Sequence, residues 1–237
     1  MSIAEKLTTI AENEQKVFAA GKQEALSAVW DSIQQKGQRT NYIYAFRYQA
    51  FTTETFKPTY DICPTNAREM FLENSGIIEE ISEKALGVKF DTSQCADIRN
   101  IFTGSKVKKV GTLSTLGTTV GAAYDLQQLF AYNITLTEIE KIILKDDGLQ
   151  SFPDTFLWCS KLKEIRFEGV IGQNISFSYC PLSRESLIDI IDHLSGTASG
   201  KTLTLKSSAV TDAFGSTDSD EWKNLIATKS NWTITLA

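Results

Sequence analysis

The fold is decided by one stretch, FLWCSKLKEIRF at residues 156–167, because its spacing of apolar and polar residues recurs upstream. Counted from the leading Phe156, a small or polar residue follows at +3, and apolar residues follow near +6 and +9. Such a unit has too little apolar surface to bury alone, so it must stack on neighbouring copies. The stretch therefore predicts a repeat architecture.

Four earlier aromatic residues head units with similar spacing. Phe130 heads a close match, Phe71 and Phe102 head looser ones, and Phe46 heads a degenerate unit without the polar residue at +3. From Phe46 to Phe156 the leading aromatics are 25, 31, 28 and 26 residues apart. Periods in this range are typical of solenoids, in which every unit adds a short strand. The apolar residues expected in the core are Ile77 and Ile81, Val107 and Val110, Leu136 and Ile139, and Leu162 and Ile165.

The residue at +3 marks the point where each unit turns into its strand. It is Asn74, Ser105, Asn133 or Cys159. A small polar side chain at this point can satisfy buried backbone groups of adjacent units, which an apolar side chain cannot do. We therefore expect a buried polar ladder, in which Cys159 is a structural thiol and has no redox role.

These repeats resemble a known family. The units NSGI, NITL and CSKL at 74–77, 133–136 and 159–162 resemble irregular leucine-rich repeats of the BspA-like type. The whole chain resembles leucine-rich-repeat-like proteins encoded in prophages and gut-bacterial genomes. The resemblance implies an α/β repeat fold, a short irregular solenoid, and a binding role in a virion. The segments that carry it are SIAEKL at 2–7, RTNY at 39–42, FKPTY at 56–60 and NWTITLA at 231–237.

Charge and targeting signals limit the partners. The net charge of −5 and the absence of a basic stripe argue against nucleic acid as a ligand. The N-terminus is polar and lacks the apolar core of a signal peptide, and no apolar run reaches membrane-spanning length. We therefore expect no membrane insertion and no standard secretion. Synthesis in the bacterial cytoplasm and release by lysis would suit a virion protein.

Residues 1–38 are predicted to be helical. Ser2 and Glu5 form a capping box, and the apolar residues that follow keep roughly helical spacing, interrupted at Glu14 and Gly21. Two interpretations stay open. The segment either caps the first repeat, or forms a self-associating coiled coil that attaches the protein to a larger assembly.

Residues 39–180 are expected to form the solenoid. In its first part, Tyr42, Tyr44, Phe46 and Tyr48 alternate, which predicts a strand that either closes the solenoid or offers a sugar-binding platform. The segments from Glu83 to Phe90 and from Gly111 to Gly121 are expected to be insertions between units, and the turn at Asp146-Asp147-Gly148 to use Gly148 at positive φ.

Residues 181–237 predict an α/β cap. A helix capped by Ser183 should run to Gly196 with Leu187, Ile190, Ile191 and Leu194 buried, and a strand should follow at 201–206. A second helix, capped by Asp218, should precede a strand at 232–236.

Metal and catalytic chemistry have little support. The four cysteines contain no CxxC pair and His193 is the only histidine, so we expect no zinc site. Asp212, Asp218 and Asp220 lack the spacing of an EF-hand. The sequence contains no GxSxG, Walker, GxGxxG or HExxH motif. We predict a protein that is not an enzyme and has no catalytic, cofactor-binding or metal-binding residues.

The expected binding surface consists of outward-facing strand residues. In the strand that ends the stretch at 156–167, Ile165 and Phe167 should point inward, which places Arg166 and Glu168 outside. Thr204 and Lys206 should point outward in the same way from the strand at 201–206. The alternative is that these side chains only form a solvated face.

The combined prediction is a non-catalytic phage or prophage virion protein of a tail, baseplate or capsid fibre. It would contact other virion proteins, bind a glycan or protein of the bacterial surface, and could self-associate through the N-terminal helix. The alternative is a bacterial leucine-rich-repeat module for protein–protein interaction, with no place in a virion.

Overall fold

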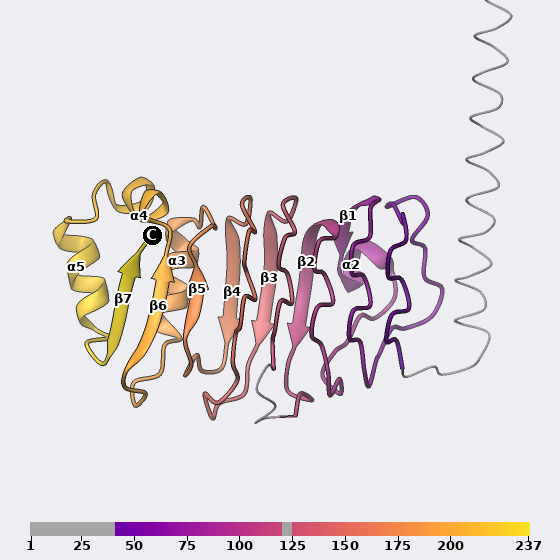
Figure 1. Ribbon diagram of the computed structural model, residues 1–237, viewed down its shortest axis with the longest axis horizontal. Helices are drawn as coiled ribbons and strands as arrows, with labels where there is room; N and C mark the ends of the chain where they lie inside the picture. The colour runs from indigo at the N-terminus through magenta and orange to yellow at the C-terminus, as the bar shows by residue number, and fades with distance from the viewer. Residues whose placement is uncertain (1–40, 120–124) are drawn as a thin grey trace, which may run out of the picture.

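The computed structural model describes residues 41–119 and 125–237 (Figure 1). The predicted helix at 1–38 therefore lies outside the described residues. The described chain is a mixture of parallel sheets and a few helices, arranged in chain order along the long axis of Figure 1. One sheet contains β1 (Ile77–Ile81), β2 (Lys106–Ser114), β3 (Glu138–Ile143) and β4 (Glu164–Glu168), and the other contains β5 (Ile175–Phe177), β6 (Lys201–Leu205) and β7 (Trp232–Leu236).

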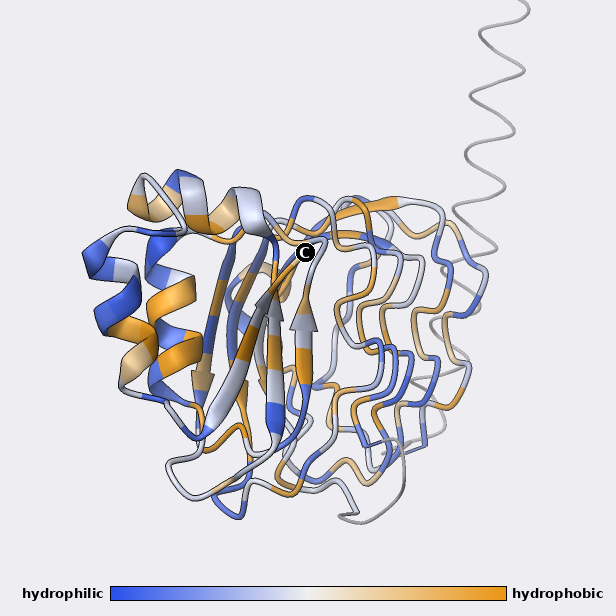
Figure 2. Cartoon of the chain, turned by 60° about the vertical axis from the view of Figure 1, so that its left-hand side comes forward, coloured by the Kyte–Doolittle hydropathy of each residue, from blue (hydrophilic) through white to orange (hydrophobic). Residues whose placement is uncertain are grey.

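Every strand pairing within these two sheets is parallel and follows the order of the chain. This order requires each unit to cross back before it adds its strand. A leucine-rich-repeat-like solenoid stays our proposal for this arrangement. The one strand that follows each of Phe71, Phe102, Phe130 and Phe156 supports it. In Figure 2, hydrophobic and hydrophilic segments alternate along the strands and the connecting segments.

The inner face of the first sheet is built from the apolar positions of the repeats. Val110, Ile139 and Ile165 are paired neighbours in successive strands and are buried. One expected core residue is wrong, because Ile77 is 45% exposed and the adjacent Ile78 is buried and pairs with Val107. In the unit headed by Phe71, the first inward-facing strand residue therefore lies one position later than expected.

A column of phenylalanine rings forms the other side of the core. Successive ring centroids are 5.5, 5.5, 5.8 and 4.5 Å apart, and the interplanar angles are at most 21°. Phe46 packs on the first ring at 5.0 Å but is tilted by 35°. The last ring belongs to β5, so the column continues into the second sheet. We define the phenylalanine column as Phe71, Phe102, Phe130, Phe156 and Phe177, all of them buried.

The backbone around this column has a repeated left-handed conformation. The residues two before and two after each of Phe46, Phe71, Phe102, Phe130 and Phe156 have φ between 50° and 62°. Only one of these ten positions is a glycine, Gly104. Residues at positive φ lie outside the β region, so the strand expected at 41–48 is wrong. The other nine are Tyr44, Tyr48, Glu69, Glu73, Asn100, Gln128, Tyr132, Asp154 and Trp158.

This conformation lets alternate amides bridge successive units. Phe71 N–H donates to Ile101 O at 2.8 Å, and Phe130 N–H donates to Thr155 O at 3.0 Å. The direction is the same along the column, since the N–H of the earlier unit donates to the carbonyl of the later one. The units are thereby hydrogen-bonded to each other on both sides of the core.

The predicted polar ladder at +3 is confirmed for three of its four members, whereas the fourth, Ser105, is buried but donates to Phe102 O of its own unit at 2.9 Å. Asn74 Oδ1 accepts from Phe51 N–H at 2.8 Å, and Asn133 Nδ2 donates to Val107 O at 3.1 Å. The Cys159 thiol lies 3.1 Å from Phe130 O. All three side chains are buried and bond to the backbone of an adjacent unit.

The same burial predicts the reactivity of the thiols. Desolvation raises the pKa of all four thiols, to about 11 for Cys95, to about 12 for Cys159 and well above its usual value for Cys180, but Cys63 alone among them is exposed to solvent. A raised pKa leaves less reactive thiolate at a given pH. At pH 8 we expect N-ethylmaleimide to modify Cys63 alone in the native protein and all four cysteines in urea, as counted by intact-protein mass. Rapid addition of two or more adducts to native protein would contradict these assignments.

The change from one sheet to the other is caused by helix α3 (Arg184–Asp192), which begins at the predicted cap Ser183. Ser186 Oγ accepts from Ile165 N–H at 2.9 Å, and Asp189 Oδ2 accepts from Phe167 N–H at 2.8 Å. These side chains occupy hydrogen-bonding positions that a further strand would use beside β4. The next strand, β5, therefore belongs to the second sheet. This second sheet begins before residue 181, where the α/β cap was expected to start.

Other C-terminal predictions are mostly confirmed. Strands β6 and β7 match the two expected strands, and Leu187, Ile190, Ile191 and Leu194 are buried. The first helix already ends at Asp192, ahead of Gly196, and the second, α5 (Asp220–Ala227), is capped by Ser219 and not by Asp218. The sequence analysis missed α4 (Ser207–Phe214), whose first turn lacks a capping side chain.

The second expected insertion begins later than predicted. Residues 111–114 belong to β2, and the first insertion contains the single-turn helix α2 (Glu83–Leu86). Gly111 allows a close approach, since a Cβ there would lie 2.7 Å from Ser82 Cβ. Gly148 has the predicted positive φ, at 63°.

Candidate functional site

The predicted residues Arg166 and Glu168 are engaged by the protein itself. They lie on β4, where Ile165 and Phe167 point inward as expected. Arg166 donates to Ser186 Oγ at 2.9 Å, and Glu168 pairs with Lys141 at 3.0 Å. These contacts favour a role in joining β4 to its neighbours.

The rest of this outer face is also a network of charges of alternating sign. Glu79 pairs with Lys108 at 2.7 Å, and Glu138 pairs with Lys109 at 2.6 Å, in each case across two adjacent strands. All four side chains are largely solvent-accessible. Such exposed pairs contribute little to stability, because water and salt screen them.

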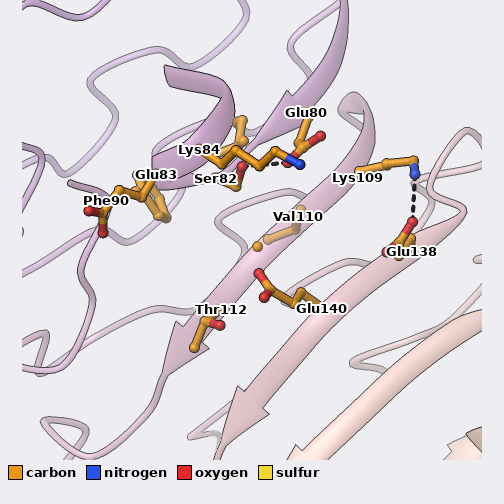
Figure 3. A pocket seen from close by; sticks show the side chains of 12 residues that line it. Glu80, Ser82, Glu83, Lys84, Phe90, Lys109, Val110, Thr112, Glu138 and Glu140 are labelled. Atoms are coloured by element: carbon orange, nitrogen blue, oxygen red, sulfur yellow. Dashed lines mark hydrogen bonds and ion pairs between the residues drawn. The ribbon is translucent and has the colours of Figure 1, made fainter. Parts of the chain in front are cut away.

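A groove of about 690 Å³ crosses this face between α2 and the strands β1 to β3 (Figure 3). Glu80, Glu138 and Glu140 line it together with Lys84 and Lys109. Figure 3 shows the Lys109–Glu138 pair inside the groove. The groove is thus open, polar and mixed in charge, and it continues the ionic surface described above.

Of the other two predicted residues, Thr204 belongs to the second sheet and Lys206 lies just after its strand β6. Thr204 lies on β6, with Ser176 of β5 and Thr235 of β7 as its paired neighbours. Its hydroxyl is 3.0 Å from that of Thr235. Lys206 immediately precedes α4 and makes no salt bridge among the described residues. Arg166 and Glu168 therefore lie on the first sheet and Thr204 on the second, and Lys206 lies outside both.

A row of aromatic residues, of which two are exposed and the third, Tyr179, is half-buried, was not predicted from the sequence. Trp158 and Tyr179 are stacked with centroids 4.2 Å apart and planes at 26°. Trp158 is still 47% exposed, and Tyr132, on the preceding unit, is 49% exposed. We call Tyr132, Trp158 and Tyr179 the aromatic row. Each lies two residues after a ring of the phenylalanine column, and this spacing is the signal that could have identified them.

The aromatic row is held by the core beneath it. Tyr132 N–H donates to Leu157 O at 2.7 Å, which ties the first two units of the row together. Under the second and third members, the Phe156 and Phe177 rings stack at 4.5 Å. The exposed rings are therefore attached to a well-ordered buried scaffold.

The N-terminal tyrosines offer a less open surface. Tyr42 is buried, and Tyr44 and Tyr48 are exposed. The Arg47 guanidinium lies 5.1 Å from the Tyr44 ring and 4.5 Å from the Tyr48 ring, and it donates to the Tyr48 hydroxyl at 2.7 Å. These cation–π contacts occupy the rings that the sequence proposed as a sugar platform.

Within residues 41–119 and 125–237, no group of three or more His, Cys, Asp or Glu side chains could hold a metal ion. In the same ranges, no helix combines the length and the apolar character needed to cross a membrane.

Comparison with known proteins gives no relative. The sequence matches no protein family and no curated protein, and no solved structure matches the chain. The likeness to BspA-like repeats therefore depends on the motifs quoted from the sequence.

Proposed function

We propose that this chain is a non-catalytic binding protein that recognises a glycan of the bacterial surface through the aromatic row. The observation that carries the proposal is the exposure of Trp158 although Tyr179 covers one of its faces. Aromatic rings bring a large apolar area with a polar edge, which suits the apolar faces and hydroxyl groups of sugars. Exposed apolar groups gathered in this way mark binding sites more often than scattered ones do.

Rigidity supports the same proposal. The row extends over successive units, and the units are joined by backbone hydrogen bonds and by the buried phenylalanine column. A preformed site loses little conformational entropy on binding. Weak stacking contacts can then add up along a glycan chain.

We further propose that the protein is a structural or adhesion component of a phage or prophage virion, in a tail, baseplate or capsid fibre. This part rests on the resemblance to prophage-encoded repeats. Other virion proteins would be its attachment partners, with residues 1–38 as the attachment segment. Detection of the chain at a fixed copy number in gradient-purified particles would support it, and absence from particles despite abundance in the lysate would contradict it.

The second candidate function is a bacterial module for protein–protein interaction. The observation that favours it is the ionic outer face of the first sheet with its groove, because charge patterns of this kind give specificity between proteins. Reversal of charge at Arg166 or Glu168 would weaken binding under this alternative. The same change would leave glycan binding through the aromatic row unaffected.

Replacement of Trp158 by alanine tests the glycan proposal. We expect Trp158→Ala to weaken binding to purified capsular polysaccharide, lipopolysaccharide or peptidoglycan by at least about tenfold, as aromatic anchors contribute about 2 kcal/mol or more at binding sites. Affinity electrophoresis with each polymer measures the change. Tyr60→Ala is the control, since Tyr60 is 66% exposed and lies outside the row. Equal binding by Trp158→Ala and wild type, or no binding by wild type to any polymer, would overturn the proposal.

A further inference from the structure

A second concave feature lies on the second sheet. We call it the hydroxyl groove. It has a volume of about 460 Å³ and includes one of the residues predicted from sequence, Thr204. Its other lining residues are Ser151, Phe152, Pro153, Gln173, Asn174, Ile175, Ser176 and Thr202.

The hydroxyl groove contains no charged lining residue. Phe152 and Pro153 supply apolar surface, and the remaining polar groups are short hydroxyls and amides. The two amide residues are fixed in place: Asn174 Oδ1 accepts from Thr202 N–H at 2.8 Å, and Gln173 Oε1 accepts from Lys201 Nζ at 2.8 Å. Apolar surface with a few neutral donors and acceptors is what a neutral, hydroxyl-rich ligand requires.

The groove and the aromatic row are built from the same two segments. Residues 151–153 and 173–176 line the groove, and Trp158 and Tyr179 follow on the same segments. The stacked rings of Phe156 and Phe177 lie between them in sequence and are buried. A strand rises about 3.3 Å per residue, so Asn174 and Tyr179 are at most about 16 Å apart.

Two further residues adjoin the two features in the sequence. Asp154, next to the groove residue Pro153, is exposed, and Ser178, next to Tyr179, is half-buried. Asp154 has no ion partner among the described residues. An unpaired carboxylate at this point disfavours an anionic ligand, because like charges repel.

We infer that the hydroxyl groove is a second subsite of the same binding site, and that the ligand is a neutral glycan chain of at least two sugar units. One unit stacks on Trp158 and Tyr179, and the following units pass Ser176 and enter the groove, where hydroxyls and amides exchange hydrogen bonds with them. This inference rests on the proposed function and deepens it, since it names the charge and the minimum length of the ligand. Thr204 then takes part in binding as a lining residue.

Isothermal titration with neutral malto-, cello- and chito-oligosaccharides of one to six units tests the inference. We expect the affinity of the wild type for at least one series to rise about tenfold or more from one to three units. Ser176→Arg should fill the groove and abolish this gain while retaining the affinity for one unit. Thr233→Arg is the matched control, because Thr233 is an equally exposed residue of the same sheet that does not line the groove. It should keep the gain.

The outcomes separate this inference from the proposed function. If affinity depends on Trp158 but not on chain length, or if Ser176→Arg keeps the length gain, the groove is not a subsite and only the aromatic row remains. Tighter binding of anionic oligogalacturonates than of every neutral series would overturn the neutral class. If Trp158→Ala binds all oligosaccharides like the wild type, the proposed function fails as well.

Discussion

Phe130→Ala is expected to lower the free energy of unfolding by about 3–5 kcal/mol, the usual cost of removing a buried phenylalanine side chain. The Phe130 ring is fully buried and stacks on Phe102 at 5.5 Å and on Phe156 at 5.8 Å. Alanine would leave a cavity in the middle of the phenylalanine column, and neighbours held by inter-unit hydrogen bonds cannot collapse to fill it. Equilibrium unfolding in urea, followed by tryptophan fluorescence, measures the change.

Tyr132→Ala is the matched control for this substitution. Tyr132 belongs to the same unit as Phe130, but its side chain is exposed. Its backbone is left-handed, as is that of Gln128 on the other side of Phe130. Surface substitutions usually change stability by no more than about 0.5 kcal/mol. An equal loss of stability in both variants would show that the column does not have the structural role assigned to it.

Asn74→Leu is expected to destabilise the protein by a similar amount, about 3–6 kcal/mol. Asn74 Oδ1 accepts from Phe51 N–H at 2.8 Å, and its Nδ2 donates to Phe51 O at 2.9 Å and to Gly76 O at 2.8 Å. Leucine has a similar volume but satisfies none of these backbone groups, and each unsatisfied buried group costs about 1–3 kcal/mol. Urea denaturation again gives the free energy of unfolding.

The adjacent Ser75 provides the comparison. Its hydroxyl donates to Gln49 O at 3.2 Å in an exposed position, where water can replace it. We expect Ser75→Ala to cost less than about 1 kcal/mol. If Asn74→Leu is as stable as Ser75→Ala, the polar ladder is not required for the packing of adjacent units.

The sequence was most informative where the same physical demand recurs in every unit. A ring at one position and a small polar group three residues later must each fit against the same group in the next unit, so both patterns are visible without a structure. The helix at 184–192 was predictable for a similar reason. Ser183 marks its start, and the spacing of Leu187 and Ile190 indicates its buried face.

Other features depend on contacts that sequence spacing does not reveal. Alternating aromatics from Tyr42 to Tyr48 look like a strand, but the left-handed conformation at Tyr44 and Tyr48 is set by hydrogen bonds to the next unit. The end of the first sheet depends on Ser186 and Asp189 reaching the backbone of β4.

The candidate site was predictable in part. Thr204 lines the hydroxyl groove, and Arg166 and Glu168 instead bond within the protein. The aromatic row was missed because an apolar residue in a repeat is normally assigned to the core. Whether Trp158 faces the interior or the solvent depends on its backbone conformation, which its residue type does not determine.

The inter-unit hydrogen bonds along the phenylalanine column share one direction, which gives the column an electrostatic polarity. The N–H groups of Phe46, Phe71 and Phe130 all point toward the C-terminal side. Each donates to a carbonyl group of the following unit. Aligned peptide dipoles add, as they do in a helix, so partial positive charge gathers at the C-terminal end and partial negative charge at the first unit. The aromatic row lies toward the positive end, where electronegative ligand oxygens are favoured over cationic groups.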